Sequence, residues 1–331
     1  MSGFRRLLNM SLAFTLIDGA ACAQEASRIL EEAWEPPALR YTPEYLRWQM
    51  SFPSVAGAHS AMAFDEDEPV GFAGTSARRL RNGDMGFEAV IVSFVGVRPG
   101  WRSRGIAAGL YRTLLGAVAK RGVPVVTFAQ AATSGERALL RAYPEAGFRV
   151  QPLGICENYG FMGRATGVEG DWRTYMSDDP CVFQAMEAQL IADGEVLWNM
   201  PTRGQFEHYL ADPRPRKLIA VEHRSTGVRG AGFVVRTELR SGQGFVSITT
   251  LDSVWLPGRA AAGLHALLQA ASRAWPDSGA MLVTCPNLSG IADSMLSAIR
   301  VRKTGSRFSA YFCAAGQVQW PAFERTNLEI V

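Results

Sequence analysis

The chain has 331 residues, a length that predicts two domains. Apolar residues make up 47% and charged residues 20% of it, which is typical of a globular protein with ample core, and the net charge of +3 is too small to indicate a nucleic-acid partner. The five cysteines are scattered, without a Cys-x-x-Cys pair or a Cys/His cluster. We therefore expect neither a metal site nor a disulfide framework, and a reducing cytoplasm fits best.

The N-terminus allows two interpretations. Arg5 and Arg6 precede a mildly apolar run, as in a secretory signal. Polar residues interrupt that run, which favours a disordered extension over residues 1–9, a strand over 12–17 and a helix over 20–34. No apolar run is long enough to cross a membrane, so we expect no membrane association.

The next stretch is aromatic and then hairpin-like. Thr42 followed by Pro43 predicts the start of a short helix that ends near Met50. Two apolar runs, 60–64 and 70–75, flank four acidic residues and predict a hairpin with a solvated turn. Asn82-Gly83-Asp84 predicts a second hairpin turn.

A strand, a tight turn and a helix follow, over 90–97, 98–105 and 106–118. A helix start presents backbone N–H groups without internal partners, and the helix dipole adds positive potential there. Gly105 and Ala107 are small enough to let a phosphate approach, and Arg102 and Arg104 supply guanidinium groups that bind phosphate. The turn therefore predicts a diphosphate site, although it is neither a Walker loop nor a dinucleotide fingerprint.

The segment Arg102-Ser103-Arg104-Gly105-Ile106-Ala107 resembles the Arg/Gln-x-x-Gly-x-Gly/Ala signature of the GCN5-related N-acetyltransferase (GNAT) superfamily. Downstream, residues 143–148 resemble that family's Tyr-x-x-x-Gly-Phe segment. The resemblance implies an α/β fold with a mixed sheet, and a turn whose residues 102–107 hold the pyrophosphate of acetyl-coenzyme A. It also implies that the preceding strand separates from its neighbour and pairs with the pantetheine arm.

The same resemblance implies the roles of single residues. Val95 and Val97 of the strand would bind the coenzyme, and the backbone amide near Val95 would polarise the thioester carbonyl. Tyr143 would protonate the leaving thiolate; the alternative is a tyrosine that only packs at a helix end.

Two positions depart from the family pattern. Glu136 stands where members often have an asparagine that holds the pantetheine arm, and Gln130 is a possible substitute. Ile91 occupies the usual place of the basic glutamate, which leaves Glu88 as the predicted general base, acting through water, or else as a carboxylate at a hairpin edge. His59 and Glu157 are weaker candidates.

The second half repeats the order of the first. We expect a catalytic GNAT domain over 10–165, a linker over 166–177 and a second GNAT-like domain over 178–331. Gly71-Phe72 is matched by Gly232-Phe233, but only eight residues run from Pro257 to Leu264 where twelve run from Pro99 to Leu110. The shorter turn lacks the phosphate-binding loop, so the second copy is predicted to be degenerate.

The main functional hypothesis is an N-acetyltransferase, which uses acetyl-CoA and no metal to acetylate a small-molecule amine by direct attack in a ternary complex. The alternatives are an acyl-CoA-binding module without turnover, and a transferase that acts on protein lysine or uses a carrier-bound acyl group. We expect a cytoplasmic protein, either a monomer or a weak homodimer. The sequence does not identify the acceptor or the acyl chain length.

Overall fold

The computed structural model describes residues 12–161, 170–176, 181–192, 196–199, 201–256, 261–276, 281–283, 293–316, 320, 323 and 325–327. The expected extension 1–9 lies outside these residues. The first half contains β1 (Leu12–Ile17), α1 (Ala23–Ala33), β2 (Ala38–Leu39), α2 (Pro43–Met50), β3 (Ser60–Asp65), β4 (Glu68–Asn82), β5 (Met85–Val97), η2 (Pro99–Trp101), α3 (Ile106–Ala119), β6 (Val125–Gln130), α4 (Ser134–Glu145) and β7 (Phe148–Phe161).

The second half contains β8 (Trp172–Met176), α5 (Cys181–Ala192), β9 (Val196–Asn199), α6 (Arg203–Leu210), β10 (Arg216–His223), β11 (Arg229–Ser241), β12 (Gly244–Trp255), α7 (Ala261–Ala274), β13 (Met281–Val283), α8 (Asp293–Ala298), β14 (Val301–Ala315) and β15 (Arg325–Asn327). β8 lies in the stretch expected to be a linker and pairs antiparallel with β10. Its mixed polar and apolar residues fit an edge strand, which shows one side to water.

Most elements follow the sequence pattern closely. Helix α2 spans the predicted residues, and the Thr42 side chain accepts a hydrogen bond from the Tyr45 amide, as an N-cap should. Strand β4 is longer than expected, because it continues past Thr75 to the Asn82 turn in register with β5. Its later residues include Arg78, Arg79 and Arg81, which obscure the alternation typical of a strand.

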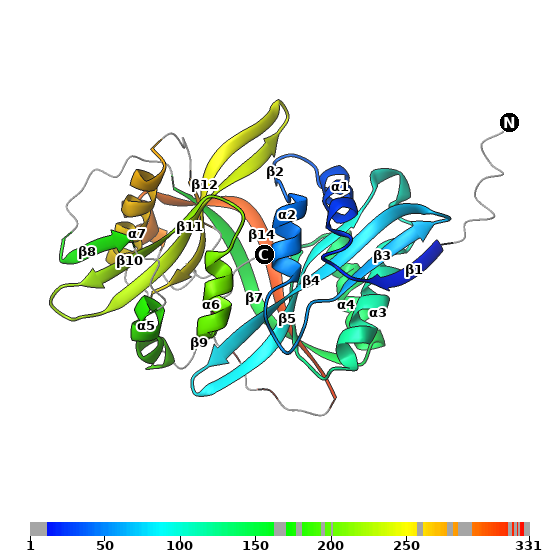
Figure 1. The fold of residues 1–331 in the computed structure, drawn as a ribbon, viewed down its shortest axis with the longest axis horizontal. Helices are drawn as coiled ribbons and strands as arrows, with labels where there is room; N and C mark the ends of the chain where they lie inside the picture. Colours follow the sequence, from blue (N-terminus) through cyan, green and yellow to red (C-terminus); the bar gives the residue numbers. More distant parts are fainter. Residues whose placement is uncertain are drawn as a thin grey trace.

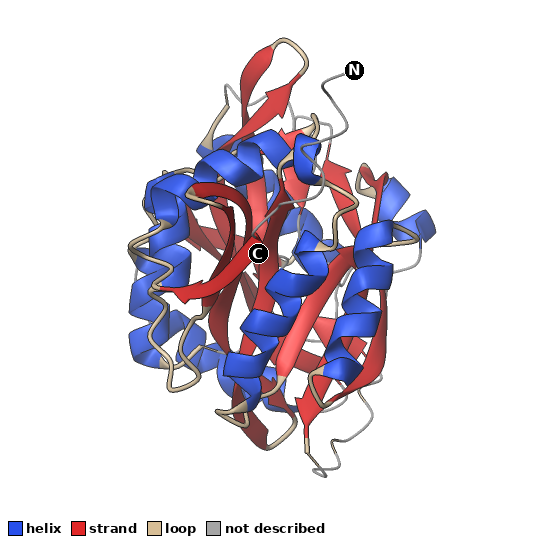
Figure 2. Cartoon of the chain, turned by 90° about the vertical axis from the view of Figure 1, so that its right-hand side faces the viewer, coloured by secondary structure: helices blue, strands red, loops and turns tan. Residues whose placement is uncertain are grey.

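One sheet runs through the whole molecule in the order β1-β3-β4-β5-β6-β14-β7-β13-β12-β11-β10-β8. Its two ends have corresponding strands: β1-β3-β4-β5-β6 on one side and β8-β10-β11-β12-β13 on the other. Figure 1 shows these two wings flanking the long central strands β7 and β14. Helices cover both faces of the sheet (Figure 2).

The two halves exchange their last strands. β7 follows the first half in sequence but pairs with β13 of the second, whereas β14 lies near the end of the second half and pairs with β6 of the first. β7 and β14 also pair with each other along most of their length. β14 is therefore a structural part of the first wing, and the short β15 that follows it pairs with β9.

The short helices α2 and α6 meet between the wings in a nearly two-fold arrangement. Each has eight residues and a threonine N-cap, and Trp48 and His208 occupy the same position in the two helices. Their rings stack with centroids 5.3 Å apart. The Trp48 indole donates to the His208 carbonyl at 2.8 Å, and His208 Nε2 donates to the Trp48 carbonyl at 2.9 Å. This reciprocal pair is what an isologous contact requires.

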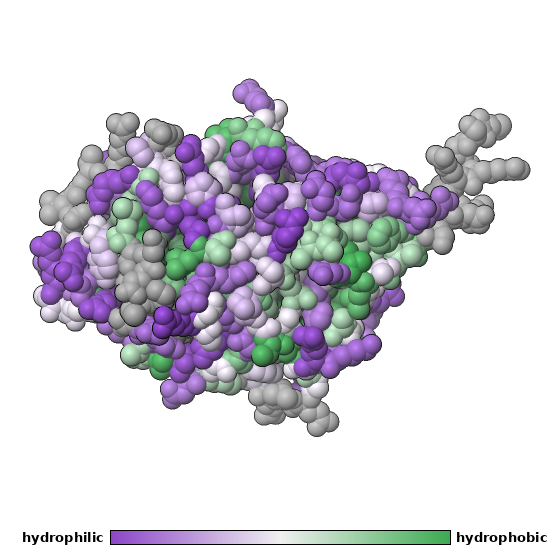
Figure 3. All heavy atoms as spheres, viewed as in Figure 1, coloured by the Kyte–Doolittle hydropathy of each residue, from purple (hydrophilic) through white to green (hydrophobic). Residues whose placement is uncertain are grey.

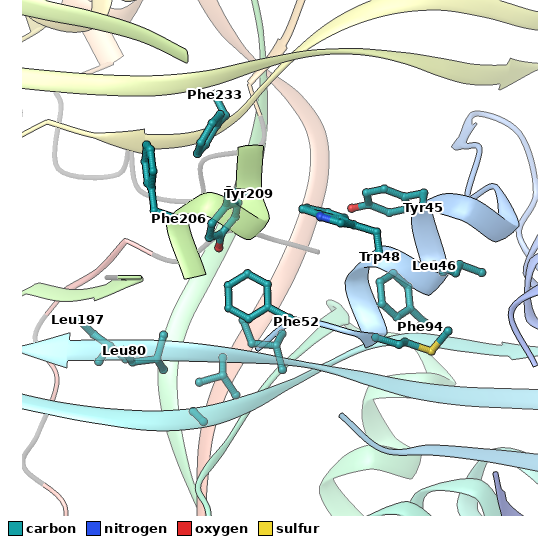
Figure 4. Packing of buried hydrophobic residues seen from close by; sticks show 14 of the residues in the cluster. Tyr45, Leu46, Trp48, Phe52, Leu80, Phe94, Leu197, Phe206, Tyr209 and Phe233 are labelled. Atoms are coloured by element: carbon teal, nitrogen blue, oxygen red, sulfur yellow. The ribbon is translucent and has the colours of Figure 1, made fainter. Parts of the chain in front are cut away.

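Around that pair the wings share one core. Figure 4 shows Phe52 of the first half near Tyr209 of α6 and Phe233 of β11. The guanidinium of Arg78 is fully buried there, lying over the Phe52 ring at 4.4 Å and donating to Gln49 at 2.6 Å. The face seen in Figure 3 is mostly hydrophilic outside, with apolar residues in small groups. A cation and aromatic rings therefore join the halves inside an ordinary polar surface.

Candidate active site

The predicted phosphate turn connects β5 to α3 through η2. Gly105 is the N-cap of α3 in the left-handed conformation, with φ of +77°, and Ser103 also has a positive φ of +63°. Residues 102–105 are exposed, and the amides of Gly105, Ile106 and Ala107 have no hydrogen-bond partner among the described residues. The helix start thus has backbone donors without internal partners behind an exposed turn, as a phosphate site needs.

Arginines surround this turn. Arg98 is 8% exposed and pairs with Glu32 at 3.0 Å and with Glu68 at 2.6 Å, which fixes the end of β5. Arg102 donates to the carbonyl of Ala33 and lies 3.4 Å from the Glu35 carboxylate. A phosphate would compete with these two contacts for the Arg102 side chain.

The strand before the turn separates from its neighbour. β5 and β6 are parallel and pair from Val90/Val125 to Val92/Thr127, after which both strands continue unpaired with each other. A β-bulge at Ser93 marks the same point, because Val92 pairs with Thr75 of β4 and Phe94 with Gly74. Bulges redirect backbone groups and are common near active sites.

The bulge decides where the backbone of β5 points. Bonded pairs alternate in an antiparallel ladder, and Arg98 donates its amide to Val70 of β4 at 3.0 Å. Residues 96 and 94 therefore bond to β4 as well, whereas Val95 and Val97 direct their N–H and C=O groups to the opposite, unpaired edge. This is the geometry predicted for a strand that pairs with a pantetheine arm.

Tyr143 lies next to Thr127, the last residue of β6 that pairs with β5. It is fully buried in α4, with ring centroids 6.4 Å from Tyr111 and 5.8 Å from Phe148. Burial raises the pKa of its phenol well above the usual value, and the adjacent Thr127 only partly offsets this rise. The hydroxyl has no well-formed hydrogen bond within the described residues. A buried, unpaired hydroxyl is costly, which is a reason to look for a functional role.

Glu136 is held by the exchanged strand. Its carboxylate accepts from the Tyr311 hydroxyl and from the Ala132 amide, both at 2.7 Å. Hydrogen bonds from Ser309 and Tyr311 lower its pKa. Tyr311 is the register partner of Thr127, so β14 contributes a polar group close to Tyr143. Gln130, the suggested substitute, is exposed at the end of β6.

Glu88 lies elsewhere, at the meeting of the β4–β5 hairpin, the loop after α2 and helix α6. Its carboxylate accepts from Ser54 at 2.5 Å and from Gln205 of the second half at 3.2 Å. No contact between Glu88 and Tyr143 occurs in the described structure. Glu88 as the base stays a prediction, and its observed contacts join three segments.

The position where the family usually has its basic glutamate and the two weaker candidates for a base have separate environments. Ile91 is fully buried in the core. His59 is half-buried, and its pKa is lowered mainly by desolvation and to a smaller extent by the positive charge of the nearby Arg121. Glu157 is paired with Lys303 at 3.2 Å and Arg307 at 3.5 Å across β7 and β14. None of these contacts brings a carboxylate or imidazole to the open edge of β5.

The second half repeats the bulge, and the strand that follows it ends among buried side chains. In β12, Asp252 is the extra residue, since Leu251 pairs with Val234 and Ser253 with Phe233. By this register Gly71-Phe72 correspond to Gly230-Ala231, two residues from the match expected on sequence. Leu256 is 4% exposed and packs near Gly230 and Gly263, where Trp172 also lies. The shorter turn, 257–260, lies outside the described residues.

Sequence analysis missed Trp34, Tyr311 and the exchanged strand. The indole of Trp34 donates to the Val95 carbonyl at 3.1 Å, on the open edge of β5. Trp34 directly follows α1, and nothing in its local sequence indicates a partner 61 residues away. No group of metal-binding side chains occurs among the described residues, and none of their helices has both the length and the apolarity to cross a bilayer.

Comparisons with known proteins agree with this geometry. Residues 22–148 match the model of the acetyltransferase (GNAT) family. The fold resembles N-myristoyltransferase of Saccharomyces cerevisiae with bound myristoyl-CoA, at 13% identity and a TM-score of 0.65, covering 93% of this chain and 80% of that one. A sequence comparison with curated proteins found no match.

Two further structures are GNAT proteins by name. A tandem GNAT protein from the clavulanic acid biosynthesis pathway has 13% identity and a TM-score of 0.60, covering 93% of this chain and all of that one (100%). A GCN5-related N-acetyltransferase from Anabaena variabilis has 12% identity and a TM-score of 0.54, covering 91% and 72%. Residues 22–148 therefore resemble the acetyltransferase (GNAT) family, and the whole chain has the fold of two tandem GNAT units.

Proposed function

We propose that this chain transfers an acetyl group from acetyl-CoA to the amine of a small-molecule acceptor. The observation that carries the proposal is the open edge of β5, where Val95 and Val97 direct their backbone groups away from β4 and toward the gap beside β6. That edge leads directly to the start of α3, where Gly105 is exposed and the amides of residues 105–107 have no partner among the described residues. One extended ligand can pair with the strand and place a pyrophosphate at the helix start.

The proposed chemistry uses groups at both ends of this edge. The acceptor nitrogen attacks the thioester carbon, and the Val95 amide donates to the carbonyl oxygen as it becomes negative. The C–S bond then breaks, and the thiolate takes the proton of Tyr143. The proton that the attacking nitrogen loses passes through water to the tyrosinate and restores the phenol. Burial keeps the Tyr143 phenol protonated at neutral pH. The choice of Tyr143 is supported by its contact with Thr127, which pairs with Val92 at the last paired position of β5 and β6.

A two-part experiment tests this proposal. Binding of acetyl-CoA is measured by calorimetry, and release of the thiol is then followed with a panel of small amines. We expect micromolar binding of the order usual for enzyme substrates and thiol release that depends on the amine. A chain that does not bind acetyl-CoA overturns the proposal. Binding without amine-dependent release supports the acyl-CoA-binding module instead, which the engaged carboxylates of Glu88 and Glu136 favour.

The base is tested separately by Glu88→Gln. The substitution keeps the side-chain shape but weakens the bonds from Ser54 and Gln205. We expect a loss of stability of about 1–3 kcal/mol, with turnover little changed, because these contacts link segments of the fold. A fall in kcat of about 100-fold with a normal melting temperature would instead identify Glu88 as the base.

A further inference from the structure

Trp34 occupies the open edge of β5 at the position of Val95. Since Val95 directs its carbonyl away from β4, the indole N–H that binds this carbonyl at 3.1 Å comes from the unpaired side of the strand. The amide of the same residue is the group proposed to hold the thioester oxygen. The Trp34 ring therefore lies next to the place where the acyl chain begins.

Aromatic packing holds this ring in place. Tyr41 meets it edge to face with centroids 5.0 Å apart, and Tyr41 in turn packs against Phe94 at 5.6 Å. The backbone of Trp34 is also fixed, because its amide closes α1 by donating to Leu30 at 3.0 Å. The indole cannot turn away without losing both its hydrogen bond and its ring contacts.

The second half adds another restraint. Arg240 of β11 donates to the carbonyls of Glu31 and Trp34 at the C-terminal end of α1. A cation at this end of a helix is electrostatically favourable. Nearby, Arg40 pairs with Glu238 at 2.6 Å, and β2 pairs with β11. The β11–β12 hairpin, seen beside β2 in Figure 1, thus holds the segment that carries Trp34.

We propose that Trp34 restricts the acyl donor to short chains by filling the space next to the thioester, and that Arg240 is a positioning residue for it. This inference rests on the proposed function, since it takes the acyl group to begin at Val95. An acetyl group ends before the indole. A longer chain requires the volume that the indole and Tyr41 occupy, and their mutual contacts resist its displacement.

The experiment compares acetyl-, butanoyl- and octanoyl-CoA with the native chain and two variants. Trp34→Ala opens the space, whereas Trp34→Phe keeps most of the ring but removes the N–H donor. We expect the native chain to prefer acetyl-CoA, and Trp34→Ala to raise the octanoyl-to-acetyl ratio of kcat/KM by at least about tenfold. Trp34→Phe should keep the native preference. Equal changes for all three donors, or a native chain indifferent to length, overturn the proposal.

Arg240→Gln tests the positioning role without touching the expected acyl path. We expect it to shift the octanoyl-to-acetyl ratio in the same direction as Trp34→Ala, by a smaller factor, while KM for acetyl-CoA rises more than kcat falls. An unchanged ratio means that Arg240 only packs the hairpin. Melting temperature and the Kd of unacylated coenzyme A show whether each variant is folded.

Binding measurements separate failure of this inference from failure of the proposed function. If the native chain releases no thiol with any amine, the dissociation constants of the three donors still report the chain-length preference. A ratio of dissociation constants that Trp34→Ala leaves unchanged contradicts the role of Trp34. No turnover together with a changed ratio contradicts only the transferase proposal.

Discussion

The two wings share a backbone feature and differ in what surrounds it. Ser93 and Asp252 are equivalent bulge residues, each just after the strand has paired in parallel with β6 or β13. In the first wing the strand leads to an exposed turn. In the second, Leu256 lies near Gly230 and α7, much as Ile106 and Leu110 of α3 lie near Gly71 in the first, and Asp252 is paired with Arg214 at 2.9 Å. The two wings are thus alike in strand geometry, and the difference expected from the sequence is the length of the turn that follows each strand.

The exchange of β7 and β14 makes the two wings depend on each other. Tyr311, on β14 of the second half, lies opposite Thr127 and holds Glu136. Arg240 reaches α1 from the second half, and Gln205 reaches Glu88. The second wing thus helps to determine the shape of the candidate site in the first wing.

The largest expected effect comes from disturbing the exchanged strand. Phe312 on β14 is 1% exposed and packs edge to face with Phe87 and Phe323. Phe312→Ala should cost about 3–5 kcal/mol of unfolding free energy, because it leaves a cavity between the halves. Urea unfolding measures this loss. If the halves unfolded independently, the first half would keep its native stability, and only a separate urea-unfolding transition of the second half would shift to lower urea concentration.

Tyr143→Phe is expected to act on catalysis instead of stability. Loss of the acid should lower kcat about 100-fold while the Kd of acetyl-CoA stays the same, since the buried ring remains in place. Tyr111→Phe is the matched control, because Tyr111 is also buried and lies in the same cluster. Equal turnover in both variants would assign Tyr143 to packing alone.

The phosphate turn can be tested with the two glycines that flank helix α3. Gly105 begins α3 with φ of +77°, and Gly122 follows it with φ of +67°; neither has an atom within 4 Å of an added Cβ. Each change to valine should cost about 1–2 kcal/mol through backbone strain. Only Gly105→Val should also raise the KM of acetyl-CoA, by about tenfold, because it disturbs the amides that meet the phosphate. Equal KM values in the two variants contradict the turn as the binding site.

The local elements of the fold could be predicted from the sequence, whereas the contacts between distant segments could not. The strand, turn and helix around Gly105 are local features, so spacing and residue type were enough to place them. The separation of β5 from β6 was expected from family resemblance, and the pairing confirms it. The insertion of β14 and the contact from Trp34 to Val95 join residues far apart in the chain, where local patterns carry no information. β8 was missed because edge strands alternate weakly.

The smallest expected effect concerns the near two-fold contact of α2 and α6. Desolvation lowers the pKa of His208, and the nearby Arg78 adds to this, although the hydrogen bond to Trp48 opposes it. Below the ordinary histidine pKa of about 6.5, His208 therefore binds fewer protons in the folded chain than in the unfolded chain. The unfolding free energy consequently decreases as the pH falls through that range. In His208→Gln the decline in unfolding free energy from pH 7 to pH 5 should be shallower than in the native chain. Trp48, at the equivalent position of the first half, carries no titratable group, so His208 is the member of the stacked pair that can titrate. Parallel curves of unfolding free energy against pH for the native chain and His208→Gln would mean that this contact is indifferent to pH.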